Sequence, residues 1–220
     1  KSVMQDGASA IENLEHAKTS LEDLQFREAA DDFALARNDF NRASGTLNSF
    51  GAVFLSSFGN IPGFSKVQSA NKLISAGQNI AQAGENLSRA FVGLSQTNFL
   101  AMLHPDTVSQ ESAAKPLKSF REVLQNADKH ITTAGTLLAD IDIGAIPPEK
   151  QDMFETFKNK IPSFKEYIKQ AVVYSDSLLE IVGPTAPKTY LILLENNSER
   201  RPSGGFPGTY AIVSFDKGTL

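Results

Sequence analysis

Apolar positions recur at alternating spacings of three and four residues along most of the chain, which is the period of an amphipathic α-helix. These stripes predict helices over about residues 3–24, 27–58, 64–102 and 110–142, a short helix at 148–159 and a last helix at 162–182. The first stripe runs from Ala10 to Leu24, and Pro162 is expected to open the last helix. Helices of about 30 residues make rods of about 45 Å. An elongated up-and-down bundle over residues 1–182 is therefore predicted.

The helix at 64–102 has a heptad pattern. Leu73, Ile80, Leu87 and Leu94 recur every seven residues, and Ala76, Ala83 and Ala90 follow the first three of them at a distance of three. Gly77 and Gly84 adjoin this row. Glycine costs a helix interior about 1 kcal/mol relative to alanine. Two glycines seven residues apart therefore indicate that a neighbouring helix packs closely there.

A phenylalanine-rich stripe runs from Phe33 to Phe58. Its simplest interpretation is a core face of the bundle. The alternative is a groove for a partner helix or a lipid tail, formed by Phe54, Leu55 and Phe58, because that cluster lies at a helix end.

The period changes after Pro187. Residues 189–194 and 209–215 are β-rich apolar runs, and Asp216-Lys217-Gly218 is a turn signal. Near-continuous apolar strands are typical of the middle of a larger sheet, and an isolated hairpin is marginal in water. We expect 183–187 to be a linker and 188–220 to hold the first strands of a truncated α/β or α+β domain.

Composition and charge exclude several functions. The chain has no cysteine, which removes thiol chemistry and thiolate metal sites. Its net charge is -4, and no basic face is available for nucleic acid. His16, His104 and His130 have no partner at metal-ligand spacing, so neither a metal nor another cofactor is expected. No apolar run reaches the roughly 20 residues of a membrane span, and we expect a missing segment upstream of Lys1.

The stretch from Glu195 to Gly208 holds the densest chemistry. Arginine forks and glycine backbone amides can bind an anion together, which indicates a phosphate- or carboxylate-binding loop. The candidate ligand-binding residues are Glu195, Asn197, Glu199, Arg200, Arg201, Ser203, Gly204 and Gly205. A purely structural interpretation stays open: the glycines supply positive φ, and Arg201 pairs with Glu195 or Glu199. No catalytic residue is predicted.

The same stretch resembles a known family. The runs 190–199, 201–206, 208–210 and 215–218 are similar to the opening of the bacterial "domain of unknown function 4012" family. The preceding helices resemble the helical region of those proteins. The sequence departs from the family pattern at Glu195, where Gln is usual, at Arg200, where Leu is usual, and at Pro207, where an aliphatic residue is usual.

The resemblance implies a cell-envelope protein that is anchored by one N-terminal membrane helix, lies outside the cytoplasm and is often associated with polysaccharide assembly. The biochemical activity of the members of that family is not established. A more distant similarity connects the strand, arginine loop and strand with the LytR-CpsA-Psr phosphotransferases, although their Arg-Ser-Asp-Thr signature has no match here.

Three functions follow as hypotheses. The first is a non-enzymatic envelope protein that acts by interaction or scaffolding, with an envelope protein as partner. The second is a phosphotransferase or carrier-binding domain that holds a polyprenyl-linked saccharide through Arg200, Arg201 and Gly204-Gly205. The third is a sensor that binds a small ligand between its helices.

Overall fold

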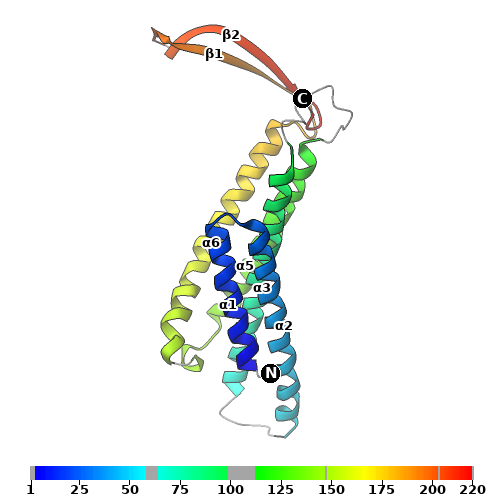
Figure 1. The fold of residues 1–220 in the computed structure, drawn as a ribbon, viewed down its shortest axis with the longest axis vertical. Coiled ribbons are helices and arrows are strands. Elements are labelled where there is room, and N and C mark those ends of the chain that lie inside the picture. The colour runs from blue at the N-terminus through cyan, green and yellow to red at the C-terminus, as the bar shows by residue number, and fades with distance from the viewer. Residues whose placement is uncertain (1–2, 58–63, 99–111, 147, 203, 220) are drawn as a thin grey trace. The chain divides into compact units, whose positions relative to one another are not determined.

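The computed structural model describes residues 3–57, 64–98, 112–146, 148–202 and 204–219 (Figure 1). Its elements are helices α1 (Val3–Glu22), α2 (Phe26–Ser57), α3 (Phe64–Gln96), α5 (Ala114–Ala139) and α6 (Pro148–Ile181), a short 3-10 helix (Ile143–Ala145), and strands β1 (Lys188–Arg201) and β2 (Gly204–Phe215). The described residues thus form a mainly helical protein whose five α-helices precede an antiparallel β-hairpin. This confirms the predicted fold class.

The chain divides into two compact units. One consists of residues 1–94 and 122–172, and the other consists of residues 95–121 and 173–220. Helices α5 and α6 each contribute residues to both units. The helical core lies in the first unit, and the hairpin lies in the second.

The prediction of two helices at 148–159 and 162–182 is wrong, because α6 is continuous and contains Pro162. Proline removes one backbone donor from a helix, but it does not end a helix that tertiary packing holds on both sides. Phe154 and Ile161 before the proline, and Ile168 after it, are all buried in the same apolar cluster. The predicted end of one helix at 102 and the predicted start of the next at 110 both lie outside the described residues.

The first helix also ends earlier than predicted. Leu24 has a φ of 58°, and its side chain is exposed rather than part of the apolar stripe. The amide of Gln25 donates to the carbonyl of Ser20 at 2.7 Å, which closes the helix in the manner of a left-handed cap. Glycine usually holds such a position, so a leucine there is no sequence signal of a turn.

One apolar cluster joins α3, α5 and α6 within the first unit. Its buried members are Ala76, Ala83, Ala127, Ile131, Ala134, Leu138, Ile141, Ile146, Phe154, Ile161 and Ile168. Ile80 and Leu87 of the predicted heptad row pack against it. Two further apolar clusters in this unit pack α1 against α2, and their buried residues include Ala10, Ala17 and Ala29.

Two phenylalanines of α2 pack onto the two heptad glycines of α3. A Cβ added at Gly84 would lie 2.5 Å from Cε1 of Phe33, and one added at Gly77 would lie 2.6 Å from Cε1 of Phe40. Real Cβ atoms do not approach other atoms so closely, so each aromatic ring fills the space that a side chain would need. The predicted packing role of both glycines is confirmed, as is the core role of Phe33 and Phe40.

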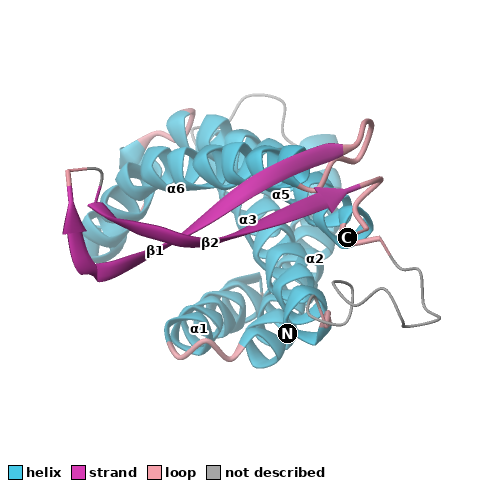
Figure 2. Cartoon of the chain, turned by 90° about the horizontal axis from the view of Figure 1, so that it is seen from above, coloured by secondary structure: helices cyan, strands magenta, loops and turns pink. Residues whose placement is uncertain are grey.

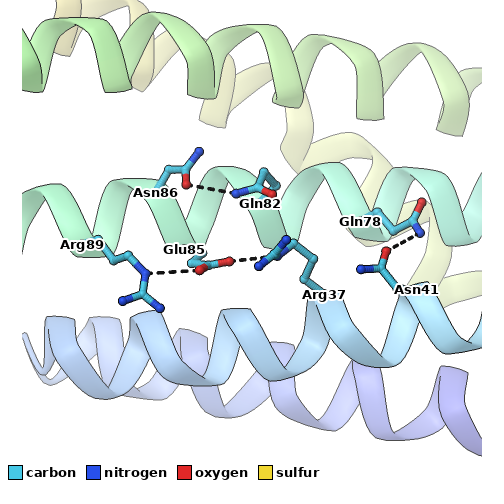
Figure 3. Close-up of polar contacts among 7 residues, drawn as sticks. All are labelled: Arg37, Asn41, Gln78, Gln82, Glu85, Asn86 and Arg89. Carbon is cyan, nitrogen blue, oxygen red and sulfur yellow. Dashed lines mark hydrogen bonds and ion pairs between the residues drawn. The ribbon is translucent and has the colours of Figure 1, made fainter.

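A polar seam borders this packing (Figure 3). The buried carboxylate of Glu85 accepts from Nε of Arg37 on α2 at 2.9 Å and from Nε of Arg89 on α3 at 3.2 Å. Gln78 donates to Asn41 at 2.8 Å across the same two helices. The seam and the aromatic contacts therefore specify one antiparallel register for α2 and α3.

Gly84→Ala is expected to destabilise the bundle by about 1–3 kcal/mol, because overpacking against the Phe33 ring outweighs the gain in helix propensity of about 1 kcal/mol. The measurement is urea unfolding followed by circular dichroism. Gly45→Ala is the matched control in α2, where an added Cβ meets nothing within 4 Å. It should be neutral or stabilising. Equal effects of the two substitutions would contradict the proposed packing.

Candidate functional site at the hairpin

The segment predicted as a loop between the strands is largely part of the strands themselves (Figure 2). β1 extends to Arg201 and pairs there with Gly204, the first residue of β2. The register shifts between Leu194 and Glu195 and again between Asn196 and Arg201. Residues 197–200 have no paired partner on β2, so this part of β1 is an irregular stretch of strand.

The carboxylate of Glu195 occupies the backbone donor expected to bind an anion. The amide of Gly205 donates to Oε2 of Glu195 at 3.3 Å. Gly204 has a φ of +119°, as the structural interpretation predicts, but Gly205 and Gly208 do not have the positive φ that it also expects of them. A Cβ at Gly204 would lie 3.1 Å from the same carboxylate oxygen. An internal carboxylate thus stands where an external phosphate oxygen would have to bind.

Arg201 lies over an aromatic ring. Its guanidinium carbon is 5.3 Å from the centroid of the Phe206 ring, which is cation–π geometry. The expected pairing of Arg201 with Glu195 or Glu199 is replaced by this contact and by the hydrogen bond that Glu195 accepts from the amide of Gly205. Arg201 remains exposed to solvent.

Among the described side chains, no contact brings the remaining candidate residues together in one cluster. Glu199 is exposed on β1. Asn197 and Arg200 lie in β1, but their side chains are outside the described set, and Ser203 is outside the described residues altogether. The groove predicted at the end of α2 also lacks described side chains. Phe54 and Leu55 are helical, but their side chains are not described, and Phe58 lies outside the described residues.

Two contributors to the hairpin end were missed by sequence analysis. Asn196 accepts the amide of Ser198 through Oδ1 at 3.0 Å, which braces the irregular part of β1. Phe206 supplies the ring beneath Arg201. An Asn whose side chain accepts from the backbone amide two residues on is a recognised turn device, so this contact had a sequence signal. A ring five positions from an arginine, by contrast, carries no sequence signal.

The middle of the hairpin exposes large apolar side chains on both faces. Cross-strand pairing places Leu191 opposite Ile212 and Leu193 opposite Tyr210, and these four side chains are between 55% and 66% exposed. Ile192 and Leu194 are exposed on the other face. We call these six residues the apolar hairpin surface. Exposed large apolar side chains gathered in this way are typical of faces that another segment or a partner covers.

Three buried carboxylates in the described part of the chain have cationic partners. Asp6 and Asp39 are buried and both contact Arg42, and Glu85 is held by two arginines. Among the described residues, no group of three or more His, Asp or Glu side chains could hold a metal ion. In the same part of the chain, no helix is long and apolar enough to cross a membrane.

The described residues form helices followed by an irregular hairpin, and the hairpin is the most distinctive segment of this protein. Residues 185–220 match the family model described as "Protein of unknown function (DUF4012)". The resemblance seen in the sequence is therefore confirmed over that segment. No curated protein and no solved structure matches the chain.

Gly205→Ala is expected to loosen the hairpin end, because the new Cβ would lie 2.8 Å from the backbone oxygen of Asn196. Hydrogen exchange of the hairpin amides should accelerate by about tenfold or more. Gly208→Ala is the control, since its Cβ would meet only Phe206 at 3.8 Å. Unchanged exchange in Gly205→Ala would mean that the close strand approach at Asn196 does not hold.

Proposed function

We propose that this chain belongs to a non-enzymatic, membrane-tethered protein of the bacterial cell envelope that works outside the cytoplasm by interaction. Its helices act as a support, and its hairpin contacts a partner envelope protein, in the setting of surface polysaccharide assembly. The envelope location and this setting come from the family resemblance.

The apolar hairpin surface is the observation that carries this proposal. Leucine, isoleucine and tyrosine side chains exposed on both faces of a two-stranded sheet leave apolar area in water, at a cost of about 25 cal/mol per Å². That free energy is recovered where these faces are covered, either by further strands of the domain that the sequence predicts or by a partner. An extended hairpin also offers two strand edges to a partner strand, as in β-strand addition.

The state of the anion-binding residues supports interaction over catalysis. Glu195 accepts from Gly205, and Arg201 contacts Phe206, so the chain itself occupies both groups. A phosphate would have to displace a carboxylate of the same sign of charge. The competing candidate is a domain that binds or transfers a polyprenyl-linked saccharide, and the exposed position of Arg201 favours it.

A ligand that binds only the native state raises its thermal midpoint by mass action, so the two candidates differ in one measurement. We expect no change in the midpoint of the protein at saturating polyprenyl pyrophosphate. Glu195→Gln removes the negative charge that competes with a phosphate, so a phosphate should bind this variant more readily than the wild-type protein. A rise in the wild-type protein that Arg201→Ala abolishes would reject the interaction proposal in favour of the carrier-binding one.

The interaction itself is tested by a photo-crosslinking residue placed at Tyr210 in the full-length protein in its own cells. We expect an adduct with a discrete envelope protein, and we expect Leu193→Asp on the same face to abolish it. The same crosslinker at the exposed Lys129 of α5 is the control. Equal adducts at both positions, or none at Tyr210, would count against the hairpin as the contact surface.

A further inference from the structure

The turn after β2 contacts the ends of two helices through its backbone. Gly218 is buried and has a φ of +83°. Its amide donates to the carbonyl of Val182, next to the end of α6, at 2.9 Å. Its carbonyl accepts from the amide of Ala113, next to the start of α5, at 2.9 Å. All of these residues belong to the same compact unit.

Only glycine fits at this point. A Cβ on residue 218 would lie 2.6 Å from Cβ of Ala114 and 2.7 Å from its amide nitrogen, and the positive φ would be strained for any other residue. The hydroxyl of Ser112 adds a bond to the carbonyl of Lys217 and accepts from the amide of Ala114 at 3.2 Å. The neighbouring carbonyl of the turn is therefore held as well.

A second set of contacts fixes β1 to the end of α6. The hydroxyl of Tyr190 donates to the carbonyl of Ile181 at 3.0 Å. The Tyr190 and Phe215 rings pack in an edge-to-face arrangement, with their centroids 6.2 Å apart. Gly183 has a φ of +58°, and a Cβ there would lie 2.7 Å from the carbonyl oxygen of Ala186. Ala114, Leu117, Leu179 and Val182 close the apolar space beneath.

We propose that the turn Asp216–Thr219 is a clasp that joins the hairpin base to the ends of α5 and α6 in one cooperative unit. Because both hydrogen-bonding groups of Gly218 are used, one to each helix, the hairpin cannot hinge freely at residues 183–187. Displacement of the hairpin by a partner therefore acts directly on both helix ends. The coupling lies within the chain, so it does not depend on what the hairpin binds.

Hydrogen exchange with mass spectrometry tests the clasp in the protein as it stands. Gly218→Ala should accelerate exchange about tenfold or more in three places together: the hairpin, the first turn of α5 and the last turn of α6. Peptides from α1 and from residues 26–47 of α2 should keep their wild-type rates. Gly208→Ala is the matched control in β2 and should change none of these peptides.

Ser112→Ala is the milder variant and decides the matter if Gly218→Ala fails to fold. It removes one side-chain bond to the clasp and leaves the backbone bonds of Gly218 intact. We expect the same three regions to accelerate together by a smaller factor. Acceleration of the hairpin alone, with unchanged helix ends, would overturn the clasp, as would wild-type exchange in both variants.

Discussion

The fold depends first on the contact of two aromatic rings with two glycines. Phe33 and Phe40 are two turns apart on α2, and each lies against a glycine of α3 that is also two turns from the other. Because a ring can enter only where a side chain is missing, this pairing fixes both the spacing and the register of the helices. The buried Glu85 meets Arg37 of α2 only in that register, whereas Arg89 holds it from the same helix. Apolar shape and charge thus select the same arrangement.

The hairpin follows a different principle, because its stability comes from its ends. The middle of each face is apolar and exposed, and an isolated two-stranded sheet is marginal in water. At the far end, Glu195 and Arg201 are engaged inside the chain. At the base, Gly218 bonds to both adjoining helix ends. Fixed ends and an uncovered middle are properties that suit a preorganised contact surface, since little conformational entropy remains to be lost on binding.

The sequence predicts what periodicity and glycine spacing encode. The helices, the packing role of Gly77 and Gly84 and the strands were all accessible in this way. The continuity of α6 was not, because packing of Ile161 and Ile168 overrides the local effect of Pro162. Nor was the exposure of Leu24, which has a φ usual for glycine. At the candidate site, residue types indicated an anion site. Only the structure places the Glu195 carboxylate on the very amide that such an anion would need.

The motif residues of the matched segment 185–220 fall into two groups with different implications. Gly204 and Gly218 have positive φ, and Gly205 approaches the backbone of Asn196, so the hairpin requires these glycines whatever the protein does. They therefore say little about function. Arg201 and the apolar hairpin surface are different, because no backbone conformation demands them and exposure of the leucines costs free energy. Residues that the backbone conformation does not require, and whose exposure costs free energy, are those for which contact with further strands of the domain or with a partner supplies a reason.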